Sequence, residues 1–365
     1  MVIILLILVL LVIAVWIFLH LPRFGKLPSG ARLERIKQCQ NYKNGQFQNL
    51  SETPMMTAEG GMTSVLKQFL FDKRRRAKPV DMIPSVKTDL LNSDPAKDLL
   101  VWFGHSSYFI QVDGKKILVD PVLSGSASPL SFNIKAFKGT DVYTTEDIPD
   151  IDFLFISHDH WDHLDYKTII QLKPKIKRII CALGVGEHLE RWGFDKDIIN
   201  ELDWNEAINL GENFVVNTVP ARHFAGRSFI RNKSVWVSFV LKTPTMKLFI
   251  GGDSGYDTHF AEIGKTFGPF DLAILENGQY NENWKYIHML PGETLAAAKD
   301  LQAKRLLPVH NSKFALSVHP WDEPLKKITE MNTDANLKLA TPMIGEEVNL
   351  KDDAQRFSKW WEGLE

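Results

Sequence analysis

The most informative segment of this 365-residue sequence is Ser157-His158-Asp159-His160-Trp161-Asp162-His163-Leu164-Asp165. It follows the apolar run Ile151–Ile156, which is typical of a buried strand. His158 and His160 are two residues apart, so both imidazoles can point to one side of an extended backbone. Asp162 and His163 come after the chain turns and can face a second centre. Because imidazole and carboxylate suit zinc when no thiolate is available, the segment predicts one half of a two-metal site.

The remaining metal ligands should come from other strand ends that converge on the same place. A lone histidine or aspartate at such a position is usually structural, satisfied by the backbone or placed in an ordinary turn. Several strand-end groups in one chain instead favour a metal site. The candidates are His223 after 214–219, Asp253 after 246–250 in Gly251-Gly252-Asp253-Ser254-Gly255, and His310 after 305–309.

Composition excludes several classes of protein. The chain has 43 Lys plus Arg against 44 Asp plus Glu, a formal net charge of −1, and no aromatic-basic stripe, so we expect no nucleic-acid partner. Only Cys39 and Cys181 are present, which excludes a disulfide framework and a cysteine-rich zinc finger. With 44% hydrophobic residues, the chain can build a sizeable core. The composition leaves the oligomeric state open.

The N-terminal run Val2–Leu19 contains only apolar side chains and would span about 27 Å as a helix, close to the thickness of a bilayer core. A cleaved signal peptide is the alternative, but no Lys or Arg precedes the run and bulky residues occupy its exit. We therefore predict an uncleaved single-pass anchor. Five cations follow the run, namely Arg23, Lys26, Arg32, Arg35 and Lys37. Because the side of a span that is richer in Lys and Arg usually stays cytoplasmic, we expect the remaining chain in the cytoplasm.

The rest of the sequence divides at about residue 98. We predict an anchor over 1–21, an irregular collar over 22–97 with a helical piece at Met62–Phe71, and a catalytic domain over 98–365. The basic run Lys73–Lys78 in the collar is either a solvated segment or a contact to anionic lipid. Beyond residue 98, strands alternate with helices, and hairpin strands such as the pair around Asp113-Gly114 occur among them. This mixture favours sheets covered by helices over a doubly wound parallel sheet.

Six segments of the sequence carry a resemblance to known proteins, and they are Val101–Ser107, Leu118–Leu123, His158–Asp165, Gly252–Tyr256, Ile263–Asp271 and His288–Glu293. They resemble the metallo-β-lactamase superfamily, and within it the N-acyl-phosphatidylethanolamine-hydrolysing phospholipases D and, more loosely, the ascorbate-6-phosphate lactonases. The resemblance covers roughly Leu99–Pro324 and implies an α+β fold, a four-layer αββα sandwich with two metals at one edge.

The resemblance also implies roles for individual residues. His158, His160 and His223 would bind the first zinc ion. Asp162, His163 and His310 would bind the second. Asp253 would bridge the two ions and act in catalysis, and His288 would face the substrate as a second catalytic residue. His105 and His319 match family-like strings, but we expect structural roles for them because the two metals do not need them.

The function that follows is a membrane-anchored metal-dependent hydrolase that uses two zinc ions, or other divalent metals, and a bridging hydroxide. We expect a phosphodiesterase of the phospholipase D type acting on N-acylated or related phospholipids. The sequence departs from those enzymes at Leu275–Trp284, where Glu276 and Asn277 replace a more apolar stretch. A lactonase or cyclic phosphodiesterase acting on a soluble substrate therefore stays open. A non-catalytic metal-binding membrane scaffold is the second alternative.

Overall fold

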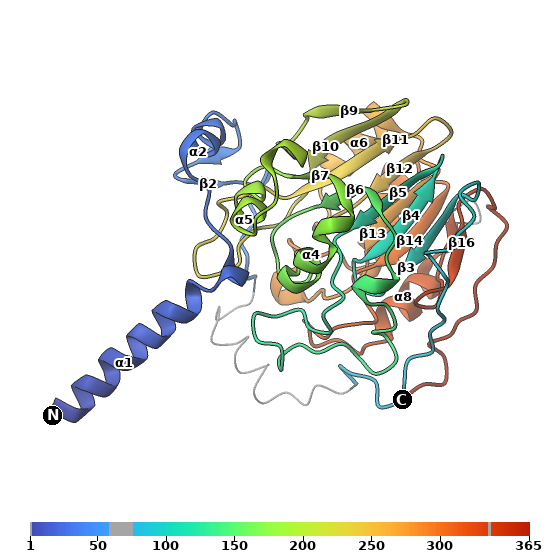
Figure 1. The fold of residues 1–365 in the computed structure, drawn as a ribbon. Helices are drawn as coiled ribbons and strands as arrows, with labels where there is room; N and C mark the ends of the chain where they lie inside the picture. The colour runs from blue at the N-terminus through green and yellow to red at the C-terminus, as the bar shows by residue number, and fades with distance from the viewer. Residues whose placement is uncertain (1, 58–75, 335–336) are drawn as a thin grey trace.

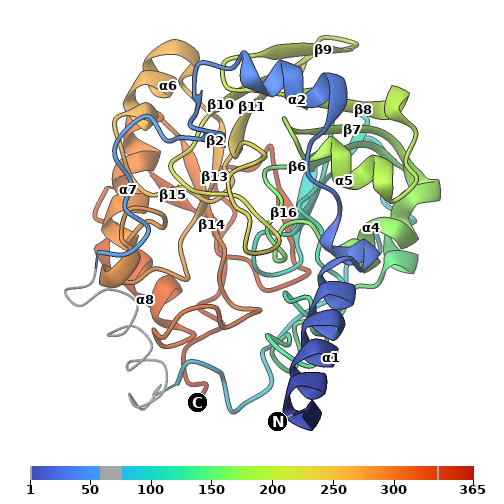
Figure 2. The same cartoon turned by 90° about the vertical axis from the view of Figure 1, so that its left-hand side faces the viewer.

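A computed structural model describes residues 2–57, 76–334 and 337–365. The helical piece expected at Met62–Phe71 and the first three cations of the basic run, Lys73–Arg75, lie outside these residues. The described chain forms two seven-stranded sheets that pack face to face, with helices on both outer sides (Figure 2). The four-layer αββα sandwich expected from the sequence is therefore confirmed.

The first sheet has the order β16-β3-β4-β5-β6-β7-β8. β3 to β5 form an antiparallel meander, and β5 to β8 are parallel. Asp113 and Gly114 both have positive φ, which closes the β4–β5 hairpin as the Asp-Gly pair predicts. The strands are β3 (Leu99–Trp102), β4 (Tyr108–Val112), β5 (Lys115–Val119), β6 (Ile151–Ile156), β7 (Ile176–Ala182), β8 (Ile199–Leu202) and β16 (Glu347–Asn349).

The second sheet has the order β15-β14-β13-β12-β11-β10-β9. β9 to β12 are antiparallel neighbours, whereas β12 to β15 are parallel. Its strands are β9 (Ala207–Gly211), β10 (Phe214–Pro220), β11 (Val237–Lys242), β12 (Lys247–Ile250), β13 (Leu272–Glu276), β14 (Arg305–Val309) and β15 (Lys338–Leu339).

The helices cover the outer faces of the two sheets. α4 (Tyr166–Leu172) and α5 (Gly186–Arg191) lie on the side of the first sheet, and α6 (His259–Phe267), α7 (Pro291–Asp300) and α8 (Glu323–Met331) lie on the side of the second (Figure 2). β12 shows how the sequence builds these layers. Leu248 and Ile250 belong to the core between the sheets, while Phe249 between them packs with the residues under α6 and α7.

The N-terminal helix α1 (Val2–Leu19) projects away from the body of the protein (Figure 1). None of its residues is buried, and it is the one helix of the described chain that is long and apolar enough to cross a membrane. A short 3₁₀ turn, Pro22–Phe24, connects it to the sandwich. The expected apolar N-terminal helix is thus present.

Residues 22–97, expected to be irregular, contain α2 (Gly30–Lys37) and the hairpin β1 (Tyr42–Lys43) and β2 (Gln46–Phe47). Arg32 holds α2 in place through three carboxylates 2.5 Å away, those of Glu187, Glu190 and Glu201. Ile36 and Phe47 are fully buried in the core of the sandwich. Local apolar patterns indicate these elements only weakly, because α2 buries a single side chain and ion pairs hold the rest.

Candidate metal centre

Parallel strands bring the candidate residues to one edge of the sandwich. β12, β13 and β14 are parallel neighbours, so their carboxyl ends lie at the same edge. Asp253 and His310 follow β12 and β14, and Glu276 is the last residue of β13. β10 runs in the same direction, because it and β12 are both antiparallel to β11, and His223 follows its end. The first sheet contributes the segment after β6 to the same edge. The convergence expected from the strand ends is therefore present in the structure.

The first ligand group comprises His158, His160, His223 and Asp253, whose potential ligand atoms all lie within 4.8 Å of one another. His160 Nδ1 is 2.9 Å from His158 Nε2 and 3.2 Å from His223 Nε2. Burial lowers the pKa values of His158 and His223 well below that of a free imidazole. Neutral imidazoles crowded around one point can each offer a lone pair to a metal ion.

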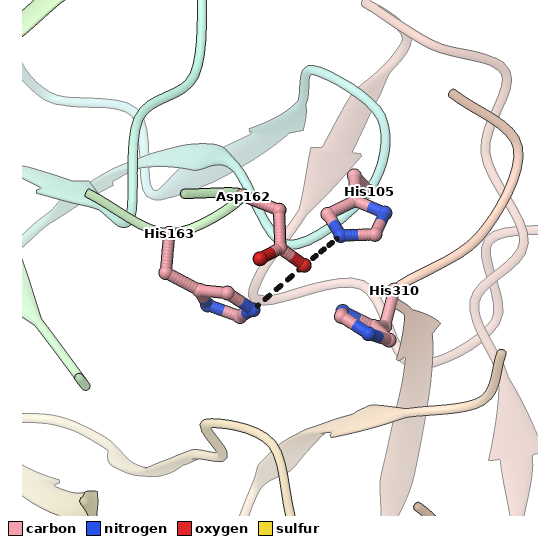
Figure 3. Close-up of side chains that lie close together, drawn as sticks. All are labelled: His105, Asp162, His163 and His310. Carbon is pink, nitrogen blue, oxygen red and sulfur yellow. Dashed lines mark hydrogen bonds and ion pairs between the residues drawn. The ribbon is translucent and has the colours of Figure 1, made fainter. Parts of the chain in front are cut away.

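The second ligand group comprises His105, Asp162, His163 and His310, again with ligand atoms within 4.8 Å of one another. Figure 3 shows the Asp162 carboxylate between the rings of His105 and His163, with the His310 ring beside them. Asp162 Oδ2 lies 2.9 Å from His105 Nε2 and 3.6 Å from His163 Nε2. His105 thus belongs to this cluster, where it can orient Asp162 by a hydrogen bond.

Asp253 lies between the two groups and presents one oxygen to each. Its Oδ1 is 3.2 Å from His163 Nε2 and 3.2 Å from His310 Nδ1 in the second group. Its Oδ2 is 3.6 Å from His223 Nε2 and 3.9 Å from His158 Nε2 in the first group. A carboxylate in this position has the geometry of a bridging ligand.

Electrostatics at the centre favour an added positive charge. Burial works against a charged imidazole, yet Asp253 and Asp162 raise the pKa of His163 well above its usual value. Within the described part of the chain, neither His163 Nε2 nor Asp253 Oδ1 makes a well-directed hydrogen bond, although both are buried and lie 3.2 Å from each other. Buried polar atoms are nearly always satisfied, so an unpaired nitrogen facing an unpaired carboxylate oxygen fits a site built for a cation. The donor set, histidine and aspartate, suits zinc.

Asp120 was not among the residues expected at the site, and it hydrogen-bonds to a histidine of the second group on the side away from the proposed metal. It follows β5, is 1% exposed, and accepts hydrogen bonds from the Ser157 backbone N–H at 2.8 Å and the Ser157 hydroxyl at 2.6 Å. It also accepts from His163 Nδ1 at 2.8 Å. A carboxylate on the far nitrogen of a ligating histidine fixes its tautomer and raises its basicity. Its position after a strand in Leu118–Leu123 was the available signal.

Backbone hydrogen bonds join the turn after β3 in the first sheet to the turn after β14 in the second. The His310 N–H donates to the His105 carbonyl, and the His105 N–H donates to the Asn311 carbonyl, both at 2.9 Å. His105 and His310 have φ values of +54° and +65°, which non-glycine residues rarely adopt. The paired hydrogen bonds hold this costly backbone, so both imidazoles are fixed at the centre.

Glu276 and His288 form a buried pair beside both ligand groups. Glu276, which is 1% exposed, lies with Oε2 2.6 Å from His288 Nδ1 and with Oε1 accepting from the Met289 N–H. Burial raises the pKa of Glu276 to about 7. Burial also opposes a charge on His288, but Glu276 overcomes it and raises the pKa of His288 to about 9. The His288 ring lies 5.0 Å from that of His223 and 5.1 Å from that of His310. His288 therefore lies next to both ligand groups.

His319 lies outside both groups and accepts a hydrogen bond from the Gln279 N–H at 2.8 Å. This contact agrees with the structural role expected for it. Asn277 likewise satisfies backbone, donating to the Pro324 carbonyl at 2.9 Å.

Comparison with known proteins gives consistent findings. The family described as Beta-lactamase superfamily domain matches residues 115–311. An uncharacterised protein of Mycobacterium tuberculosis is 35% identical over 329 residues, which are 89% of this chain and 88% of that protein. The N-acyl-phosphatidylethanolamine-hydrolyzing phospholipase D 1 of Caenorhabditis elegans is 28% identical over 79% of this chain and 87% of its own length.

Among solved structures, a metallo hydrolase from the archaeon Ignicoccus hospitalis matches 69% of this chain and 98% of its own, with a TM-score of 0.53 and 20% identity. That likeness supports the fold. Together with the family match over more than half of the chain and the converging histidines and aspartates, it leads to one conclusion. The chain belongs to the beta-lactamase superfamily and is a metal-dependent hydrolase of that fold.

Proposed function

We propose that this protein is a membrane-anchored, zinc-dependent phosphodiesterase of the phospholipase D type that acts on N-acylated or related phospholipids. The observation that carries the proposal is Asp253, which directs one oxygen to each ligand group. We assign His158, His160 and His223 to the first zinc ion. We assign Asp162, His163 and His310 to the second, with Asp253 shared by both.

Two zinc ions in these groups would activate water and polarise the phosphoryl oxygens of a substrate. Asp253 can accept a proton from the attacking water, because its carboxylate is buried between the groups. His288 is partly open, with 12% of its side chain exposed, and Glu276 fixes its Nδ1. Its Nε2 is then free to donate a hydrogen bond to a phosphate oxygen or a proton to the leaving alkoxide.

The N-terminal helix and the relatives support a lipid substrate. α1 would anchor the chain with residues 98–365, the catalytic domain, in the cytoplasm, and residues 22–97 would join the two. The relative from Caenorhabditis elegans is named for hydrolysis of N-acyl-phosphatidylethanolamine and covers most of this chain. An enzyme held at the bilayer by α1 would meet such a substrate directly.

The test uses the full chain in detergent micelles, first for metal content and then for activity on N-acyl-phosphatidylethanolamine in ¹⁸O-labelled water. We expect about two zinc ions per chain, because structural completeness of the ligand set favours loading. Attack of water at phosphorus places ¹⁸O in phosphatidic acid and releases unlabelled N-acylethanolamine. Asp253→Asn should lose metal and activity together, whereas Asp353→Asn, whose side chain is 65% exposed, should keep both.

Three outcomes would contradict the proposal in different ways. Less than about one zinc ion per chain would undercut the two-metal site. Full loading with activity on lactones or cyclic phosphodiesters, but none on phospholipid vesicles, would favour a hydrolase of soluble substrates. Unchanged activity of the Asp253→Asn protein would show that hydrolysis does not take place at these ligand groups, and would leave them a metal-binding scaffold.

A further inference from the structure

Two surface loops are tied to the segment through which α1 leaves the sandwich. The first, here the 130 loop, comprises residues 124–138, and the second, the 229 loop, comprises residues 224–234. Arg23, four residues after α1, donates from Nη1 to the Pro129 carbonyl in the 130 loop at 2.6 Å. Arg227 in the 229 loop donates from Nε and Nη2 to the Arg23 carbonyl at 3.1 and 2.9 Å. Both loops therefore lie beside the end of α1.

The tip of each loop exposes large apolar side chains. Phe132 in the 130 loop is 73% exposed, and Phe229 and Ile230 in the 229 loop are 86% and 48% exposed. Phe132 and Phe229 are the only phenylalanines in the described part of the chain whose side chains are largely exposed. Apolar side chains gathered at one place on a surface indicate a contact with another apolar phase.

These tips are held in place by hydrogen bonds within each loop. In the 130 loop, the Ala127 N–H donates to Ile134 and the Ala136 N–H donates to Gly125. In the 229 loop, the Asn232 N–H donates to the Ala225 carbonyl, and Asn232 Oδ1 accepts from the Ala225 N–H. The exposed rings thus project from closed loops.

Both loops are basic and contain no acidic residue. The 130 loop carries Lys135 and Lys138, and the 229 loop carries Arg227, Arg231 and Lys233. Of these, Arg227 is buried, where it stacks on Trp161 at 3.9 Å. The remaining cations lie close in sequence to the apolar tips. Apolar side chains flanked by cations match the interface of a membrane that contains anionic lipid.

We propose that the tips of the 130 and 229 loops insert into the lipid surface beside α1, so that three points fix the orientation of the catalytic body on the bilayer. A single helix with a short connection would leave the body free to tilt against the bilayer. Two apolar tips attached to Arg23 remove that freedom. The proposal rests on the membrane anchor of the proposed function, but it does not depend on which bond the enzyme hydrolyses.

The docked orientation would bring lipid close to the metal centre. The 229 loop begins directly after His223, and the ring of its first residue, Phe224, lies 4.4 Å from that of His160. The Gly226 N–H in the same loop donates to Asp159 Oδ1 at 2.6 Å, within the segment that carries the first ligands. One short loop therefore connects the inserted tip to the site.

The test is depth-dependent quenching in the full chain, reconstituted into vesicles of phosphatidylcholine and phosphatidylglycerol. Phe132→Cys, Phe229→Cys and Ile230→Cys would each be made in a Cys39→Ser background and labelled with an environment-sensitive fluorophore. Cys181 is fully buried and can stay. Met331→Cys is the matched control, since Met331 is a 50% exposed apolar residue on α8, on the side of the body away from α1 (Figure 1).

We expect a blue shift and loss of emission by headgroup-proximal spin-labelled lipid at all three tip positions, and neither at position 331. Equal emission at the tips and at 331, in protein that floats with the vesicles, would overturn the docking proposal and leave the anchor intact. Protein that does not float with vesicles would overturn the anchor and the docking together. Burial of the tip labels in lipid-free detergent solution, accompanied by self-association, would assign this face to a second copy of the chain and also overturn the proposal.

Discussion

Asp120→Asn tests whether the hydrogen bonds that Asp120 accepts from Ser157 and His163 control the affinity of the metal centre for zinc. Asp120 Oδ1 accepts from the Ser157 N–H, and Oδ2 accepts from the Ser157 hydroxyl and from His163 Nδ1. An asparagine of the same shape has only one acceptor oxygen. If its amide NH₂ faces Ser157 N–H, two donors oppose each other. If it faces His163 Nδ1, the ring must move its proton to Nε2.

The second arrangement removes a ligand, because His163 Nε2 is the atom that faces Asp253 Oδ1 at 3.2 Å. Loss of an outer carboxylate of this kind typically weakens metal binding by about 10- to 100-fold, or roughly 1.4–2.8 kcal/mol at 25 °C. We therefore expect zinc affinity to fall by this amount in the second ligand group, while the fold persists.

The assay is zinc competition against a chromophoric chelator, using the full chain in detergent. Thermal unfolding with excess chelator checks that the variant folds. Asp113→Asn is a matched control, because Asp113 also has a positive φ, +46° against +40° for Asp120, and also accepts several hydrogen bonds, from Thr243 and Thr245. If Asp120→Asn binds zinc as tightly as Asp113→Asn, the carboxylate does not control the His163 tautomer and the reasoning fails.

Two further predictions address the neighbouring pair and the attachment of α2. Replacing Glu276 with Gln keeps the shape of the side chain but removes the charge that raises the pKa of His288 to about 9. The alkaline limb of the kcat/KM profile should therefore move to lower pH, and kcat should fall about 100-fold, with metal content unchanged. An unaltered pH profile would exclude a role for the charge. Arg32→Met should cost about 3 kcal/mol and speed amide exchange in α2 about 100-fold at pH 7, because it removes the cation paired with Glu201 and leaves Glu187 paired with Lys26 alone. Burial opposes the charge on Glu187, but Lys26 and Arg32 lower its pKa below 4.5. The stabilisation by the ion pair is therefore present above pH 4.5 and is lost as pH falls through the folded-state pKa. A difference in stability between variant and wild type that persists undiminished at lower pH would contradict this prediction.

Local sequence patterns predicted the central strands well because burial and periodicity are strong there. Ile151–Ile156 and Arg305–Val309 have the bounds expected from the sequence. Edge strands were harder to find: β9 directs only two apolar side chains, Ile208 and Leu210, toward the core, and an alternation this short is a weak signal. β16 pairs with β3, which lies more than 240 positions earlier in the chain, and no local pattern reports such a contact.

The site followed the same division. Its histidines and aspartates stand at strand ends, and the sequence pointed to them because metals require those residue types. The residues that hydrogen-bond to these ligands are not restricted to a residue type that the sequence would reveal. Glu276 was noticed only as a departure from related phospholipases, and its contact with His288 depends on how the chain returns after β13. Which group a residue supports is decided by three-dimensional packing.

The division of ligands between the sheets has a consequence for biosynthesis. The first sheet supplies His158, His160, Asp162 and His163, whereas the second supplies His223, Asp253 and His310. A ribosome-bound chain that has emerged only through β7 holds two of the four ligands proposed for each zinc ion, and the last of these ligands arrives after residue 309. Hydrolytic activity would therefore appear only after β14 has been made, although α1 is made first.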